Sequence, residues 1–147
     1  MLSGEAIVMG DDISADDISP TVAFSDEPEK IRNSCFLYLM PSIDLKDKVI
    51  VAGNRFGWGS YRESAALCLL YSGVKAIIAK SFGYGMYRNL INLGIPALIW
   101  DIRAEDGDII RIDLEGRKAY IGKKEYDIEI SDIALHILKH GGLMDVP

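Results

Sequence analysis

The sequence has few of the residues from which disulfide frameworks and metal centres are built: two cysteines and two histidines among 147 residues. Cys35 and Cys68 are far apart in the sequence and lack ligand-like spacing, which argues against both kinds of site. Cys68 lies in an apolar run, as is typical of a buried, unreactive thiol. His136 and His140 have a spacing that can bind metal, but without a third ligand nearby a solvated helix face is the simpler interpretation.

A basic excess and long apolar runs are also missing. The net charge is −6 and the basic residues are dispersed, whereas nucleic-acid binding needs a clustered basic face. No apolar stretch approaches the roughly 20 residues that a membrane helix needs, and the first residues lack the pattern of a secretory signal. We therefore expect a cytoplasmic protein with neither nucleic-acid nor membrane partners. Its length and 49% hydrophobic content suit a single domain over residues 1–147.

The middle of the sequence predicts a βαβ unit. Apolar runs at 48–53 and 75–79 are rich in β-branched residues, as in buried strands. Between them, apolar residues recur at helical spacing over 61–72, and Gly73 can end that helix in a left-handed conformation. A crossover of this kind is right-handed in nearly all proteins.

The other segments extend this unit into an α/β fold. The last third alternates apolar and polar residues, which predicts an antiparallel β appendage before a terminal helix. The further predicted elements are a strand at 5–9, an ordered loop at 11–20, a short helix opening at 27–32, a helix at about 84–93, a strand at 96–100, strands at 110–114, 118–121 and 125–130, and a helix at 133–139.

A glycine loop joins the first central strand to its helix and is the strongest candidate for a site. Residues 57–63 read Gly-Trp-Gly-Ser-Tyr-Arg-Glu, and Arg62 stands where a dinucleotide-binding or a Gly-x-Ser-x-Gly motif needs glycine. No Gly-Lys-Ser/Thr follows, so it is not a P-loop. Gly57 and Gly59 allow a ligand to approach the backbone, and the helix N-terminus adds unpaired amides and roughly half a positive charge.

An anion, most simply a carboxylate, is the natural ligand of such a loop. Ser60 lies near the N-cap, and Arg62 in the first turn can bind a carboxylate through two hydrogen bonds. The alternative from physical chemistry alone is structural: Ser60 caps its helix and Arg62 pairs with a surface carboxylate.

Several ordered blocks of sequence are specific when they are taken together. They are Gly-Asp-Asp-Ile-Ser-Ala-Asp-Asp-Ile-Ser-Pro at 10–20, Val-Ile-Val-Ala-Gly at 49–53, Gly-Ser-Tyr-Arg-Glu at 59–63, Ala-Ile-Ile-Ala-Lys-Ser-Phe at 76–82 and Tyr-Arg-Asn-Leu-Ile-Asn-Leu-Gly-Ile-Pro at 87–96. With these blocks the sequence resembles the 3-isopropylmalate dehydratase small subunit and, equally, the swivel domain of aconitase and homoaconitase. The resemblance is good over residues 10–20 and 48–100, weak in 21–47 and only general in the tail.

The resemblance implies a small swivelling β/β/α domain that closes over a large subunit carrying a [4Fe-4S] cluster, with no cofactor on this chain. The heterodimer would be a hydro-lyase for a hydroxy di- or tricarboxylic acid, as in leucine biosynthesis. It implies that Ser60 is the base that removes the substrate's α-proton and that Arg62 binds a substrate carboxylate. Asp16 and Ser19 would orient the substrate, and Gly57, Gly59 and Tyr61 would line its site.

A serine base is chemically demanding, because a hydroxyl is a very weak acid. The helix dipole supplies at most about 2 kcal/mol, and one oxyanion-hole amide about 2.7–4 kcal/mol, so several donors and Arg62 are required together. The leaving hydroxyl also needs activation, most simply by a Lewis-acidic metal. Two cysteines cannot hold an iron–sulfur cluster, which needs about four thiolates or substitutes, so another chain must supply this half of the site.

The sequence departs from the family pattern near the expected substrate. Trp58 stands where a small residue or cysteine is common, Tyr61 replaces a second serine, and Ser64 replaces a polar residue that is usually histidine. Residues 21–26 lack the usual Tyr-Leu pair and contain no arginine for a distal carboxylate. One hypothesis is a substrate with an apolar or unusual side group. The alternative is a non-catalytic regulatory or anion-binding paralogue.

Overall fold

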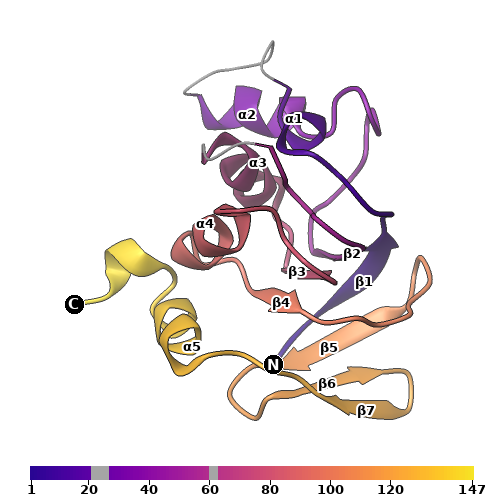
Figure 1. Ribbon diagram of the computed structural model, residues 1–147, viewed down its shortest axis with the longest axis vertical. Helices are drawn as coiled ribbons and strands as arrows, with labels where there is room; N and C mark the ends of the chain where they lie inside the picture. Colours follow the sequence, from indigo (N-terminus) through magenta and orange to yellow (C-terminus); the bar gives the residue numbers. More distant parts are fainter. Residues whose placement is uncertain (21–26, 60–62) are drawn as a thin grey trace.

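The computed structural model describes residues 1–20, 27–59 and 63–147. The described residues form a seven-stranded sheet and five α-helices, with a short 3₁₀-helix near the C-terminus (Figure 1). The strands are β1 (Leu2–Val8), β2 (Lys48–Ala52), β3 (Ala76–Ala79), β4 (Ala97–Ile99), β5 (Ile109–Asp113), β6 (Lys118–Ile121) and β7 (Lys124–Asp127). The helices are α1 (Ala15–Ile18), α2 (Pro28–Ser34), α3 (Ser64–Ser72), α4 (Met86–Asn92), α5 (Asp132–Lys139) and η2 (Leu143–Asp145).

Strands β1 to β4 are parallel neighbours, and this confirms the predicted βαβ unit. Ile50 of β2 pairs with Ile7 of β1 and with Ile77 of β3. The helix between β2 and β3 ends at Gly73, which has a φ of 81° as its predicted left-handed conformation requires. These strands are continuous apolar runs because a parallel sheet is covered on both of its faces.

The predicted antiparallel strands are present, and they extend the same sheet. The free edge of β1 pairs with β5, with Gly4 opposite Ile110, and β6 and β7 follow in antiparallel register. The strand order β4-β3-β2-β1-β5-β6-β7 puts β4 and β7 at opposite edges. Nevertheless the rings of Trp100, just after β4, and Tyr126, in β7, are 5.3 Å apart. The sheet therefore curls until its two edges approach each other.

The segment 11–20, predicted as a loop, contains the one-turn helix α1, and this part of the prediction is wrong. Ser14 Oγ accepts a hydrogen bond from Asp17 N at 3.0 Å, and an Asp17 carboxylate oxygen accepts one from Ser14 N at 2.9 Å. This reciprocal capping box satisfies amides that would otherwise lack partners at the start of a helix. Ala15 and Ile18, three residues apart, bury the inner face of the turn.

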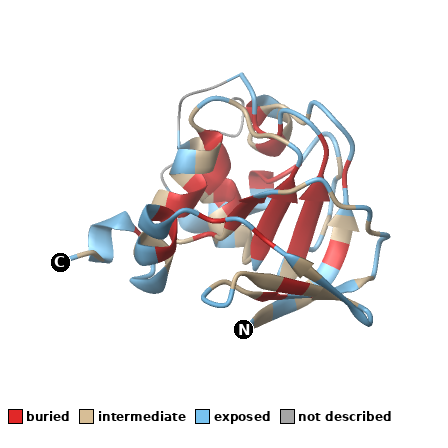
Figure 2. Cartoon of the chain, turned by 60° about the horizontal axis from the view of Figure 1, so that its bottom comes forward, coloured by how far each residue is buried: buried red, intermediate tan, exposed pale blue. Residues whose placement is uncertain are grey.

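The short helix expected near residues 27–32 is confirmed as α2. Figure 2 shows that buried residues concentrate in the central strands and on the inward faces of the helices, whereas the β6–β7 hairpin is more exposed. Cys68 is fully buried, as expected. Within the described part of the chain, no helix is long and apolar enough to cross a membrane.

Removing a buried side chain from β3 should cost much of the folding stability. Ile78 is fully buried, so Ile78→Ala is expected to lower the free energy of unfolding by about 2–5 kcal/mol through lost burial and a residual cavity. Ile133 on α5 is 76% exposed, so Ile133→Ala is the matched control with little expected effect. Urea unfolding of both variants tests this, and equal losses would contradict the described core.

Candidate active site

The loops that follow β1, β2 and β3 gather at the carboxyl edge of the parallel strands, where ligands bind in open α/β sheets. Backbone hydrogen bonds hold these loops against one another beyond the strands. Gly57 N donates to Ile13 O at 2.7 Å, and Phe56 N donates to Ser81 O at 3.0 Å. The glycine loop thus lies between the other two loops, with its backbone fixed on both sides.

The two glycines of the loop have different surroundings. Gly57 has a φ of 78° and is buried, and a Cβ there would lie 2.6 Å from Met86 Cγ. Gly59 has a φ of 99° and is exposed, and an added Cβ would meet no atom within 4 Å. Gly57 therefore lets the loop pack onto α4, whereas the space beside Gly59 is open to a ligand.

Helix α1 carries two of the predicted site residues and is joined to the glycine loop. Ala15 N donates a hydrogen bond to Trp58 O at 2.7 Å. The next residue, Asp16, is exposed and forms no hydrogen bond or ion pair with any described residue. Ser19 is half-buried and forms the C-cap of α1. The two residues thus differ in exposure: Asp16 lies at the surface of α1 and Ser19 is half-buried at its end.

Cys35 and Cys68, far apart in sequence, are neighbours beneath α1. The Cys68 thiol lies 3.2 Å from Ile31 O of α2 and 3.6 Å from Ile18 O of α1. The hydrogen bond to Cys68, together with burial, raises the pKa of Cys35, and the hydrogen bond from Cys35 lowers the pKa of Cys68. Through these contacts, the Cys68 thiol of α3 links this helix to α1 and α2.

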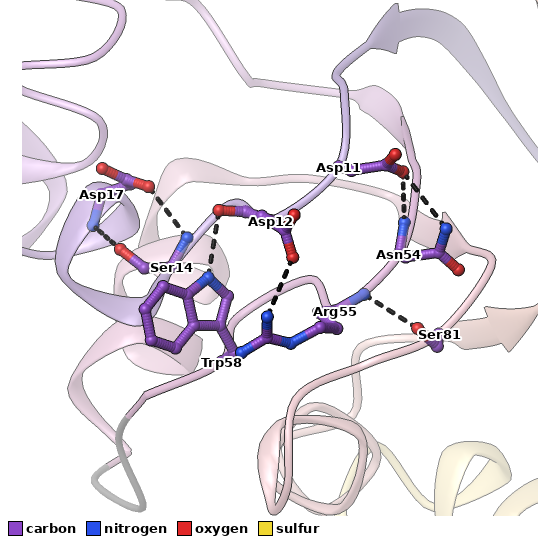
Figure 3. A network of polar contacts seen from close by, with 8 residues as sticks. All are labelled: Asp11, Asp12, Ser14, Asp17, Asn54, Arg55, Trp58 and Ser81. Atoms are coloured by element: carbon purple, nitrogen blue, oxygen red, sulfur yellow. Dashed lines mark hydrogen bonds and ion pairs between the residues drawn. The ribbon is translucent and has the colours of Figure 1, made fainter.

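A polar network on the outer side of these loops was not predicted from the sequence (Figure 3). Arg55 Nη1 lies 3.3 Å from Asp12 Oδ1, and the guanidinium carbon stacks 4.8 Å from the centre of the Trp58 ring. Trp58 Nε1 donates to Asp12 O at 3.0 Å. Nearby, Asn54 N donates to Asp11 Oδ1 at 2.7 Å. These contacts join loops more than 40 residues apart in the sequence, and no local motif signals them.

The predicted residues Ser60, Tyr61 and Arg62 lie outside the described residues, as does the segment 21–26. The described chain resumes at Glu63, the N-cap of α3, whose side chain forms no capping hydrogen bond. The first turn of α3 carries no acidic residue. Glu63 is thus the described carboxylate at this helix end, where the helix dipole favours negative charge.

The described ranges contain no group of three or more histidine, cysteine, aspartate or glutamate residues that could hold a metal ion. Cys35 and Cys68 are enclosed among helices and provide two sulfur atoms. His140 Nδ1 lies 2.9 Å from His136 O, so this ring contacts its own helix. An iron–sulfur cluster does not fit the described residues of this chain.

The sequence and the structure are both similar to known proteins. The family model named aconitase C-terminal domain matches residues 24–100. A methanogen homoaconitase small subunit from Methanocaldococcus jannaschii is 37% identical, over 99% of this chain and 90% of that protein. A 3-isopropylmalate dehydratase small subunit from Halothermothrix orenii is 34% identical, over 98% and 93%. A crystal structure of 3-isopropylmalate dehydratase from Methanocaldococcus jannaschii has a TM-score of 0.89 at 36% identity, covering 98% of this chain and 91% of that one.

The close approach of the loops depends on Gly83, which follows β3. A Cβ on Gly83 would lie 2.6 Å from Trp58 N and closer still to Trp58 Cα. Gly83→Ala should therefore displace the glycine loop and lower the free energy of unfolding by about 1–3 kcal/mol. Gly10→Ala is the control, because a Cβ there meets nothing within 4 Å. Urea unfolding compares the two variants. If Gly83→Ala leaves the free energy of unfolding unchanged, the close packing of Gly83 against Trp58 is refuted.

Proposed function

The chain belongs to the aconitase C-terminal domain family, and we propose that with a large subunit it forms the active site of a hydro-lyase for a hydroxy di- or tricarboxylic acid. It is a small subunit of the isopropylmalate dehydratase and homoaconitase type. The observation that carries the proposal is the match to two such subunits along nearly the whole chain, including the loops at the carboxyl edge.

Ser60 is the proposed base. In the sequence it stands between β2 and α3, three residues before Glu63, the N-cap of that nine-residue helix. Ser60 Oγ takes a proton from the carbon next to a substrate carboxylate, and the hydroxyl group leaves from the neighbouring carbon. The products are an unsaturated acid and, after protonation of the hydroxide, water. The helix amides and Arg62 would stabilise the alkoxide form of the serine.

Arg62 is the proposed carboxylate clamp, and Asp16 is proposed to orient the substrate from α1. Support for Asp16 is its exposure and its lack of partners among the described residues. Ser19, at the C-cap of α1, is proposed to orient the substrate together with Asp16. Tyr61 and Gly59 would line the same site.

The large subunit is proposed to carry the [4Fe-4S] cluster, which would supply the Lewis acid that activates the leaving hydroxyl. The described residues of this chain offer no ligand set for such a group. Within this complex, 3-isopropylmalate is the proposed substrate, which would give the enzyme a role in leucine biosynthesis. Relatives named for isopropylmalate and for homoaconitase are similar to the chain to nearly the same degree, so overall identity does not choose between them.

Ser60→Ala should abolish turnover while leaving the complex intact. Loss of a general base costs about 10²–10⁴-fold in rate, and a serine alkoxide should fall at the upper end. The measurement is the formation of unsaturated acid by the co-purified two-subunit complex. Ser3→Ala, at an exposed position of β1 far from the carboxyl edge, is the matched control. Full turnover by Ser60→Ala would refute the assignment, and an inactive wild-type complex would favour the non-catalytic paralogue.

Arg62→Lys should raise KM at least about tenfold, because lysine keeps the charge but cannot form the two parallel hydrogen bonds of a guanidinium with a carboxylate. Steady-state kinetics of the complex measures this. Arg111→Lys on β5, where the guanidinium stacks over Tyr120, is the control and should leave KM unchanged. An unchanged KM in Arg62→Lys would mean that a group other than Arg62 binds the substrate carboxylate.

A further inference from the structure

We propose that Trp58 determines which hydroxy acid the enzyme accepts. Its indole ring forms an apolar wall against the substituent of the substrate that does not react, and it favours a branched alkyl group over a charged chain. The proposal rests on the proposed function and adds a specificity residue to it.

Trp58 lies between the groups proposed to bind the substrate. It precedes Ser60 by two residues, so the two Cα atoms are at most about 7 Å apart. On its other side, Trp58 O accepts the hydrogen bond from Ala15 N, and Asp16 is the next residue of α1. A substrate held by Ser60 and Asp16 must therefore pass close to Trp58.

The indole ring is held in one orientation before any ligand arrives. Its only polar atom, Nε1, donates to Asp12 O at 3.0 Å, and the Arg55 guanidinium lies over the ring. The residue nevertheless remains 38% exposed. Because Nε1 already has its acceptor, the exposed part of the ring offers carbon surface and no hydrogen bond. A fixed apolar surface of this kind selects ligands by shape at little entropic cost.

The charges around Trp58 favour an uncharged substituent. Arg55 is paired with Asp12, so it brings no net charge to the wall. The preceding loop also carries Asp11 and Asp16, whose exposed carboxylates form no ion pair with any described residue. A distal substrate carboxylate would meet these like charges, whereas an isopropyl group would meet carbon. The same wall therefore rejects a longer acidic chain and accepts an alkyl group.

The test compares 3-isopropylmalate with 3-methylmalate, which differ only in this substituent, and adds an acid with a carboxylated side chain. The wild-type complex with its large subunit, Trp58→Ala and Trp58→Phe are assayed with 3-isopropylmalate, with 3-methylmalate and with homocitrate. Trp58→Ala should lower kcat/KM for 3-isopropylmalate about 10- to 100-fold and for 3-methylmalate less than about threefold, since single alkyl carbons carry about 10- to 200-fold discrimination. Trp58→Phe should keep most of the preference. Trp100→Phe, beside Tyr126, is the control and should leave it unchanged.

Equal losses for both alkyl substrates in Trp58→Ala would overturn the proposal, since they would assign Trp58 a structural or subunit-docking role. Efficient turnover of homocitrate by the wild-type complex would also overturn it. If the wild-type complex turns over none of the three acids, the proposed function itself fails. If instead the wild-type complex is active and its substrate preference is the same in the Trp58 variants, the proposed function stands and only the role of Trp58 is refuted.

Discussion

The parallel pairing of β1, β2 and β3 is the constraint on which the candidate site depends. It aligns the carboxyl ends of three strands, and the pairing continues into the loops beyond them. Met9 N donates to Val51 O at 2.8 Å, and Lys80 N donates to Gly53 O at 3.0 Å. Segments separated by dozens of residues in the sequence are consequently held at hydrogen-bond distance. Asp16, Trp58 and the start of α3 face the same region because of this pairing.

Under the proposed function, this edge forms half of an active site, and its chemistry is in keeping with that division. Among its described charged groups, Arg55 pairs with Asp12 and Lys80 pairs with Asp101. Such groups can orient an acid and hold a proton. They cannot activate a poor leaving group, which needs a stronger Lewis acid than any described side chain here offers. In the proposed reaction, the large subunit that subunits of this type imply would therefore supply the Lewis acid.

The sequence predicted the elements that have a clear local period and missed what depends on distant contacts. The central strands and α3 followed from apolar runs, helical spacing and Gly73. The one-turn helix α1 is too short to show a helical repeat of apolar residues. Only its Ser14–Asp17 capping box could have predicted it from the sequence. The pairing of β5 with β1, the contact between the two cysteines and the Arg55–Asp12 ion pair join residues far apart in the chain. No spacing within a window of sequence encodes them. The roles of Ser60 and Arg62 came from resemblance, because physical chemistry alone left a structural alternative open.

Trp58 shows how such a fold can vary its specificity without refolding. Its main-chain oxygen holds α1, and its main-chain nitrogen and Cα pack against Gly83. These contacts do not depend on which side chain is present. The indole, in contrast, is fixed by Asp12 and Arg55 and faces outward. A different side chain at position 58 would therefore change the wall while leaving the join between the two loops intact. The close packing at Gly83 restricts the backbone of this position, so variation is confined to the side chain that the substrate would meet.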